Sequence, residues 1–314
     1  MAKMTFIITG GAGFIGRHLV KNLRNRYPDS HIIVIDKLGI GSDKKSIQSY
    51  DVELLQLDLL DRQLLGLLCT TITEQVDCVF HLAAESHVDR SISSPSCFVD
   101  SNVTGTFNIL FGLQNKYKKF VHVSTDEVYG SLNTDSDASK ETDALNPSSI
   151  YSSTKASSDL IVLASYHTNK FPVLVTRCCN NYGQGQNDEK FIPTIIRNAR
   201  KNNPIPVYGD GKNIREWISA DDHTIAIMDL YEKGQIGEIY NIGSDYRIDN
   251  LKLVKNILSI LNKSENLISF VKDRPGHDIC YKLDSRKIRN IINLPKYDDQ
   301  KFLELLEHTI DKYI

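Results

Sequence analysis

The chain has 314 residues, of which 41% are hydrophobic and 24% are charged, the balance of an ordinary globular protein. Its formal net charge of −2 gives no basic field, which argues against nucleic acid as a partner. No apolar run approaches the ~20 residues of a membrane-spanning helix, and no signal peptide precedes the first strand. We therefore expect a cytoplasmic protein with no membrane partner. The six cysteines show no C-x-x-C spacing and the nine histidines form no cluster, so we predict no metal.

Short β-branched runs alternate with helical patterns through about the first 180 residues. Strands are predicted at 4–9, 31–36, 52–57, 77–82, 119–124 and 172–176. Helices are predicted at 14–26, 61–73, 96–117 and 151–168. This alternation predicts an α/β fold, a Rossmann-type doubly wound parallel sheet with helices on both faces.

After residue 180 short polar turns become frequent, and helical patterns continue at 191–202, 221–233, 249–262 and 299–313. We expect residues 1–180 to form an NAD(P)-binding domain. Residues 181–314 are expected to form mainly a smaller, mixed α/β substrate-binding lobe, with some strands and helices returning to the first domain.

A glycine-rich loop joins the first predicted strand to the first predicted helix. Its glycines are Gly10, Gly13 and Gly16, with Phe14 and Ile15 between the last two. Glycines at this spacing permit a tight turn and let the backbone approach a pyrophosphate at the helix N-terminus. The loop therefore predicts a dinucleotide cofactor.

Asp36 ends the second predicted strand, 20 residues after Gly16. A carboxylate there binds the ribose 2′-hydroxyl and repels a 2′-phosphate, which favours NAD. Arg17 and Lys37 leave NADP open, because either can compensate a 2′-phosphate; the alternative is that both are solvated surface charges. Asp58 follows the third strand and is placed to bind the adenine, with a helix N-cap as the alternative.

Three reactive side chains follow the apolar run 120–123, at the point where a predicted strand ends. Thr125, Asp126 and Glu127 bring one hydroxyl and two acids into an open crevice. Two adjacent carboxyls can act as acid and base only if their environments separate their pKa values. The alternative is a solvated strand end that caps the following turn.

Tyr151 and Lys155 are four residues apart, so they are neighbours on one face of a predicted helix. A lysine ammonium beside a phenol favours the phenolate, and so does a positively charged nicotinamide ring. We expect these two charges to bring the pKa of Tyr151 from about 10 towards the range of a working base.

With these motifs the chain resembles the extended short-chain dehydrogenase/reductase superfamily and, more narrowly, the nucleotide-sugar 4,6-dehydratases of the dTDP-glucose and UDP-glucose type. The matching segments span nearly the whole chain. They are 9–16, 36–38, 81–91, 102–106, 124–130, 151–156, 176–183, 189–193, 208–217, 241–243 and 273–277. The triplet 125–127 is the discriminating one, because the sugar-nucleotide 4-epimerases usually lack its two acids.

The resemblance implies a redox-neutral dehydration. Tyr151 takes the proton of the sugar C4 hydroxyl, which Thr125 hydrogen-bonds, and hydride passes to the nicotinamide while Lys155 holds its ribose. Glu127 then removes the C5 proton and Asp126 protonates the leaving C6 hydroxyl. Hydride returns to C6, giving a 4-keto-6-deoxy sugar nucleotide for deoxysugar, rhamnose-type biosynthesis. Because the cofactor is regenerated it is expected to stay tightly bound, and whether C5 is epimerised stays open.

The resemblance also implies the remaining ligand contacts. The cofactor set is completed by Leu59, Leu82, Ala83 and Ala84. The substrate set is Ser86, Asn180, Asn181, Lys190, Tyr208, Arg215, Asn241 and Arg274. Within it the two arginines are candidates for the diphosphate, because guanidinium forks match phosphate oxygens; surface charges are the alternative. For the adjacent asparagines, the alternative to a substrate contact is that they only form a turn.

Some positions depart from the family pattern. Gln184 and Gly185 stand where the family often has Pro, segment 39–43 lacks a usual Tyr, and Arg17 replaces a frequent Ser. Glucose and N-acetylglucosamine both stay open, as do UDP and dTDP, although segment 26–38 and the short tail look more like UDP-sugar members. A 4-epimerase and a non-catalytic nucleotide-binding protein are the alternative functions. A homodimer paired through helices 96–117 and 151–168 is expected by analogy.

Overall fold

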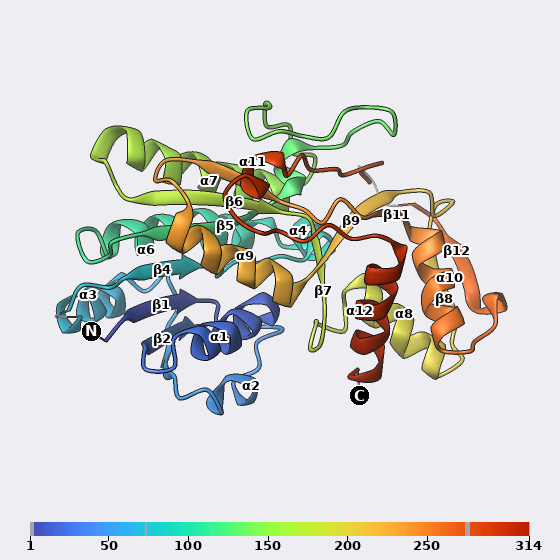
Figure 1. Cartoon of the computed structure of the whole chain (residues 1–314), viewed down its shortest axis with the longest axis horizontal. Helices are drawn as coiled ribbons and strands as arrows, with labels where there is room; N and C mark the ends of the chain where they lie inside the picture. The colour runs from blue at the N-terminus through green and yellow to red at the C-terminus, as the bar shows by residue number, and fades with distance from the viewer. Residues whose placement is uncertain (1–2, 73, 274–276, 314) are drawn as a thin grey trace.

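Seven parallel strands form the central sheet, in the order β10-β6-β5-β4-β1-β2-β3 (Figure 1). The computed structural model describes residues 3–72, 74–273 and 277–313. The strands are β1 (Thr5–Thr9), β2 (His31–Asp36), β3 (Glu53–Gln56), β4 (Cys78–His81), β5 (Phe120–Thr125), β6 (Val173–Cys178) and β10 (Ile239–Ile242). Strand order reverses between β1 and β4, and such a switch point leaves a crevice at the carboxyl ends of the strands.

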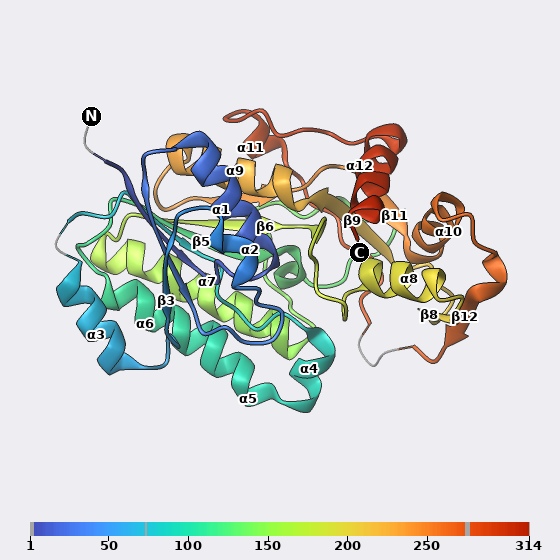
Figure 2. The same cartoon turned by 90° about the horizontal axis from the view of Figure 1, so that it is seen from below.

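Helices cover both faces of this sheet (Figure 2). One face carries α1 (Phe14–Arg26), α2 (Lys45–Gln48) and α9 (Ala220–Lys233), and the other carries α3 (Arg62–Thr71), α6 (Gly105–Gly112) and α7 (Ile150–Asn169). Alternate residues of β1 pack against the helices on opposite faces of the sheet. Phe6 belongs to the core that includes Leu19 of α1, whereas Ile7 belongs to the core that includes Ile109 of α6 and Val162 of α7. The predicted doubly wound fold is confirmed.

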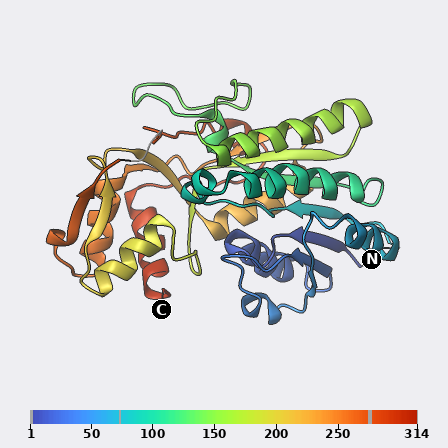
Figure 3. The same ribbon diagram turned by 180° about the vertical axis from the view of Figure 1, so that it is seen from behind.

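A smaller lobe lies beside the carboxyl ends of the strands, as Figure 3 shows from behind. It contains two small sheets, formed by β7 (Asn180–Tyr182), β9 (Ile214–Ser219) and β11 (Arg247–Asp249) and by β8 (Ile205–Tyr208) and β12 (Ile268–Val271). Its helices are α8 (Phe191–Arg200), α10 (Asn250–Ile260) and α12 (Asp299–Asp311).

Short helical segments complete the fold: α4 (Val88–Ser93), α5 (Pro95–Phe98), η1 (Val99–Thr104), η2 (Asp126–Tyr129), η3 (Glu265–Leu267) and α11 (Arg286–Arg289).

The chain crosses between the two lobes more than once. β10 returns to the large sheet, where Ile239 pairs with Val175 of β6. α9 returns to pack on α1, and the Asn22 Nδ2 donates to the Thr224 Oγ1 at 2.8 Å. The second half of the chain therefore completes the nucleotide-binding layer as well as building the smaller lobe.

The long helix predicted at 96–117 is present but ends five residues earlier than predicted. It consists of α5, the wide-turned segment η1 and then α6, which ends at Gly112. Beyond it Asn115 adopts a left-handed conformation with φ of 64°, and Tyr117 bridges to Val76. A residue in that conformation ends a right-handed helix. The other predicted helices and strands of the first half lie within a few residues of their predicted bounds.

Within the described residues there is no helix whose length and apolar character would let it cross a membrane. Nor do residues 3–72, 74–273 and 277–313 group three His, Cys, Asp or Glu side chains in a way that would hold a metal ion.

Candidate active site

One large cavity of about 1110 Å³ follows the carboxyl ends of the strands and continues between the two lobes. All of the predicted catalytic and cofactor-binding residues line it. So do six of the predicted substrate-binding residues, namely Ser86, Asn180, Asn181, Lys190, Tyr208 and Arg215. Residues from ten segments of the sequence are thus brought to one pocket large enough for two elongated ligands.

The glycine loop leaves no room for side chains. A Cβ on Gly16 would contact the carbonyl oxygen of Gly10 and lie 2.7 Å from the Cα of Gly11. Gly10 itself has a left-handed φ of 70°. α1 begins at this loop, and its N-cap residue Gly13 provides no side-chain cap. The free N–H groups of the first turn therefore face the cavity, as a bound pyrophosphate requires.

The Asp36 carboxylate is held by its own neighbourhood beside this loop. It accepts hydrogen bonds from the Ala12 N–H at 3.0 Å, the Leu38 N–H at 2.7 Å and the Ser42 Oγ at 3.0 Å. It is 6% exposed. A fixed, buried acid at the end of β2 fits a ribose diol and opposes a 2′-phosphate.

Both basic residues that left NADP open have carboxylate partners. The Lys37 Nζ lies 2.8 Å from a Glu85 oxygen, and the Arg17 Nη1 lies 3.6 Å from an Asp43 oxygen. Neither charge is therefore left uncompensated for a 2′-phosphate. Asp58 accepts from the Leu60 N–H and lines the pocket, while the N-cap of α3 is Asp61.

β5 delivers the two acids into the cavity by turning into the short helix η2. The Thr125 Oγ1 accepts from the Glu127 N–H at 3.2 Å and donates to Asp126 at 3.2 Å. Gly130 ends the turn with a φ of 79°, and a Cβ there would collide with the Asn146 carbonyl oxygen. This turn places adjacent side chains in different surroundings.

Asp126 is the more buried of the two acids. It is 3% exposed, and its Oδ2 has no hydrogen-bond partner among the described residues. Burial raises the pKa of Asp126 well above its ordinary value, and the neighbouring Glu127 and Glu216 carboxylates raise it further. This shift favours the protonated form of Asp126, which can donate a proton, whereas Glu127 is only partly buried.

Tyr151 and Lys155 lie one turn apart at the start of α7. The helix begins with a reciprocal hydrogen-bonded cap between Ser149 and Ser152. The Lys155 Nζ donates to the Val123 carbonyl oxygen at 2.7 Å, and burial lowers the pKa of Lys155 to about 8.

The protein's own side chains do not lower the pKa of Tyr151 as we expected. Burial raises the pKa of Tyr151 well above its ordinary value, and the nearby Glu127 and Cys178 raise it further. Only the hydrogen bond from Thr125 acts in the opposite direction. The protein surroundings thus keep the phenol protonated, and a cationic ligand has to supply the missing stabilisation of the phenolate.

Arg215 is the central charge of the substrate half. Its Nη2 donates to the Asp278 carbonyl oxygen at 2.9 Å, and its guanidinium lies 4.4 Å from the centre of the Tyr281 ring. Asp278 also accepts from the Ser148 Oγ at 2.5 Å and from the Tyr281 hydroxyl. The C-terminal segment therefore holds Arg215 against the start of α7.

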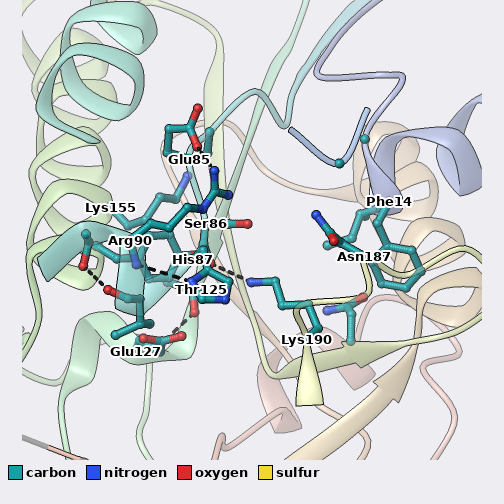
Figure 4. Close-up of a pocket in the computed structure, with 18 of the residues that line it drawn as sticks. Phe14, Glu85, Ser86, His87, Arg90, Thr125, Glu127, Lys155, Asn187 and Lys190 are labelled. Atoms are coloured by element: carbon teal, nitrogen blue, oxygen red, sulfur yellow. Dashed lines mark hydrogen bonds and ion pairs between the residues drawn. The ribbon is translucent and has the colours of Figure 1, made fainter. Parts of the chain in front are cut away.

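Contacts between the lobes cross the pocket mouth. The Lys190 Nζ donates to the Ser86 carbonyl oxygen at 2.7 Å, and Arg90 pairs with Glu189 at 3.2 Å and with Glu85 at 3.6 Å (Figure 4). These charged groups face one another at the seam between the nucleotide-binding domain and the smaller lobe.

One predicted substrate contact, Asn241, is not brought to the pocket. Asn241 is fully buried elsewhere: its Nδ2 donates to the Ser139 carbonyl oxygen at 2.9 Å, and its Oδ1 accepts from the Tyr129 hydroxyl at 2.8 Å. Its polar atoms are occupied in joining β10 to the long connection after β5. Arg274 lies outside the described residues. Asn181 lines the pocket, but its amide is also engaged, by the Cys179 carbonyl oxygen and His223.

Several pocket residues escaped the sequence analysis. Glu85 and Arg90 lie in a matched motif but received no role in it. Asp278 and Tyr281 carried no recognisable signal, since each is an isolated residue in a segment without regular structure.

The fold, the glycine loop and the paired Tyr151 and Lys155 define a Rossmann-type enzyme with a dinucleotide groove joined to a second ligand site. Residues 6–243 match the NAD dependent epimerase/dehydratase family. The chain belongs to this family, within the short-chain dehydrogenase/reductase superfamily.

Relatives come from bacteria and archaea. The chain is 41% identical to the dTDP-glucose 4,6-dehydratase of Neisseria meningitidis, over 90% of this chain and 86% of the relative. It is 38% identical to the low-salt glycan biosynthesis protein Agl12 of Haloferax volcanii, over 99% of both chains. The crystal structure of DesIV, a dTDP-glucose 4,6-dehydratase from Streptomyces venezuelae with NAD bound, has a TM-score of 0.92 and 38% identity, covering 99% of this chain and 97% of that one.

Proposed function

We propose that the protein is an NAD-dependent nucleotide-sugar 4,6-dehydratase, a hydro-lyase whose substrate is dTDP-glucose. The observation that carries the proposal is the buried Asp126, whose pKa is raised well above its ordinary value, beside the more exposed Glu127 and in the same pocket as the Tyr151 and Lys155 pair. Relatives that share 37–41% identity over most of the chain are dTDP-glucose 4,6-dehydratases. For this reason we choose thymidine over the uridine favoured by segment 26–38.

NAD fits the cofactor half because the glycine loop, the uncapped start of α1 and the fixed Asp36 carboxylate match its pyrophosphate and ribose. When bound, NAD supplies a hydride acceptor and donor and a positive charge near Tyr151. The Tyr151 phenolate, which this charge would stabilise, takes the proton of the substrate C4 hydroxyl, with the Thr125 hydroxyl as its hydrogen-bonding neighbour. Lys155 adds a second positive charge on the same side.

The two acids divide the elimination. Glu127 is the base that removes the C5 proton, made acidic by the C4 ketone. Asp126, whose raised pKa favours the protonated form, gives its proton to the C6 hydroxyl as water leaves. Proton transfers of this kind contribute about 10²–10⁴-fold each. Arg215 and Lys190 neutralise the diphosphate, and Tyr208 lies at the nucleoside end. Return of the hydride to C6 and addition of a proton at C5 then give a 4-keto-6-deoxy sugar nucleotide, a precursor for rhamnose-type deoxysugars.

A homodimer is part of the proposal. Val99 of η1, Phe107 of α6 and Leu160 of α7 are apolar and 46%, 41% and 59% exposed on packed neighbouring segments. A two-fold partner that covered these helices would remove this apolar area from water. We place the enzyme in the cytoplasm, a proposal supported by six free cysteines. Light scattering is expected to give twice the mass of 35.5 kDa.

The test is NMR of the purified protein in D₂O with dTDP-glucose, UDP-glucose and UDP-N-acetylglucosamine in separate samples, without added cofactor. We expect a 6-deoxy methyl signal with deuterium at C5 from dTDP-glucose, and ring couplings that report the configuration at C5. A C4 epimer from any of the three would overturn the roles of Asp126 and Glu127. No reaction even with NAD supplied would favour a non-catalytic nucleotide-binding protein.

A further inference from the structure

Two loops meet across the cofactor half of the pocket. Loop 39–43 follows β2, and loop 183–187 follows β7; both line the cavity. A Cβ built on Gly41 would lie 2.7 Å from the Nδ2 of Asn187 and 3.8 Å from its Cβ. Figure 4 shows Asn187 beside Phe14 of the glycine loop, on the opposite side of the pocket from Lys155. The loops therefore touch above the place where the helix N-terminus receives a pyrophosphate.

Loop 39–43 is fixed to the nucleotide-binding domain. The Ser42 Oγ donates to Asp36 at 3.0 Å, and the Asp43 N–H donates to the Ala12 carbonyl oxygen at 2.8 Å. These bonds hold Gly41 in its left-handed conformation, with a φ of 83°, over the cofactor groove.

Loop 183–187 is fixed to the same domain by α1, although it begins the smaller lobe. The His18 Nε2 donates to the Gln184 carbonyl oxygen at 3.0 Å, and its Nδ1 lies 2.9 Å from Asp221. His18 is 8% exposed. Lys21 also pairs with Asp221, at 3.1 Å. His18 therefore connects the loop to both α1 and α9.

Arg17 fills the space between the two loops. A Cβ on Gly185 would lie 2.8 Å from the Arg17 Nη1, and the same nitrogen lies 3.6 Å from Asp43. The Arg17 Nε donates to the Gly13 carbonyl oxygen at 3.4 Å. A larger residue at 185 would displace this guanidinium, so Arg17 and Gly185 fit as a pair.

We propose that loops 39–43 and 183–187 form a strap across the cofactor groove, closed by the Gly41–Asn187 contact and the Arg17 wedge, and that opening of this strap limits how fast the dinucleotide leaves. The proposal rests on the proposed function only in taking the dinucleotide to be NAD. The strap is built where the sequence departs from its family, at Arg17, at 39–43 and at Gln184 and Gly185. Retention of the cofactor in this chain thus depends on a contact between loops as well as on the glycine loop beneath.

The strap can be locked by a disulfide. The distance of 3.8 Å between the two Cβ positions at 41 and 187 equals the mean for disulfide-bonded cysteines. The double variant Gly41→Cys with Asn187→Cys is loaded with NAD and then oxidised, and disulfide formation is verified by mass.

The measurement is exchange of bound NAD for isotope-labelled NAD, followed by mass spectrometry. We expect exchange at least about tenfold slower in the oxidised double variant than in the same protein after reduction. The single variant Asn187→Cys, treated in the same way, controls for oxidation of the native cysteines and should exchange equally in both states. Equal exchange rates in the locked and reduced double variant would overturn the strap.

A second variant covers the case in which the disulfide does not form. Asn187→Ala removes the side chain that meets Gly41 and is expected to speed NAD exchange by about tenfold, while Asn290→Ala, on the exposed turn after α11, should match the parent protein. Exchange unchanged by Asn187→Ala would contradict the proposal. If the parent protein held no NAD at all, the proposed function would fail instead, which is a separate outcome.

Discussion

The two halves of the pocket are built in different ways. The cofactor half comes mostly from one stretch of chain, residues 10–59, and depends on backbone conformation: the glycines of the loop exclude side chains, and Asp36 is fixed by main-chain N–H groups. The sugar half gathers side chains from distant segments, and Arg215 is positioned by the Asp278 carbonyl and the Tyr281 ring. We therefore expect single substitutions in the cofactor half to abolish cofactor binding, and single substitutions in the sugar half to weaken substrate binding by degrees.

The largest effect is expected from Gly16→Ala. The added Cβ would collide with the Gly10 carbonyl oxygen and lie 2.7 Å from the Gly11 Cα, both backbone atoms that cannot move aside. The loop would have to open, and the N–H groups that receive the pyrophosphate would be misplaced. We expect complete loss of bound NAD from the purified protein, measured by mass spectrometry.

Gly66→Ala is the matched control. Gly66 lies within α3, and a Cβ there meets no atom of the described residues within 4 Å. Alanine in a helix interior is more favourable than glycine by about 0.5–1 kcal/mol. This variant should keep its NAD and melt slightly higher; loss of NAD from it would mean that any helix substitution disturbs the loop.

The second-largest effect is expected from a substitution at the place where the cofactor half meets the sugar half. Asp126→Asn keeps the size and the neutral charge of the protonated acid but removes the proton that it donates. We expect dehydration to fall by about 10²–10⁴-fold while oxidation at C4 persists, visible as NADH absorbance near 340 nm and a trapped 4-keto sugar. Equal loss of oxidation and dehydration would show that Asp126 acts on packing and not on the leaving group.

The two halves of the pocket also differ in how much of their structure could be predicted from the sequence. The strands of the first half were recognisable as short β-branched apolar runs, and the glycine loop and the motif that ends β5 were recognisable by their fixed spacing. The short strands β7 to β12 were not predicted, since runs of three to six residues beside polar turns carry little periodicity. Tyr281 and Asp278 reach the pocket only through the tertiary path of the C-terminal segment, which no local pattern encodes.

The pKa of Lys155 gives a prediction for stability of the cofactor-free protein. Burial lowers this pKa to about 8, from 10.5 in the unfolded chain. Below pH 8 both states carry the charge and the folded state bears the full cost of burying it. Between pH 8 and 10.5 the folded lysine loses its proton before the unfolded one, so its contribution to stability rises with pH, by about 3 kcal/mol.

Lys155→Met isolates this contribution from the other titrating groups. The stability of the parent protein minus that of the variant, from urea denaturation at pH 7.5 to 10 after cofactor removal, should rise across the interval. A flat difference would mean that the lysine is solvated in the folded protein, and the burial that supports its place beside Tyr151 would be in doubt.

The smallest effect tests the correction at Asn241. Its amide joins the Ser139 carbonyl and the Tyr129 hydroxyl, so Asn241→Ala removes one hydrogen bond from each of two buried groups, which keep the Asp284 N–H and Arg177 as their other partners. We expect unfolding to become easier by about 1–3 kcal/mol with KM for the nucleotide sugar unchanged. Arg215→Met should do the reverse, raising KM with little loss of stability, because its charge faces the pocket. If instead Asn241→Ala raised KM at unchanged stability, the substrate would reach β10, beyond the residues that line the pocket. The sugar half would then include that strand, and the contrast between the two halves would have to be revised.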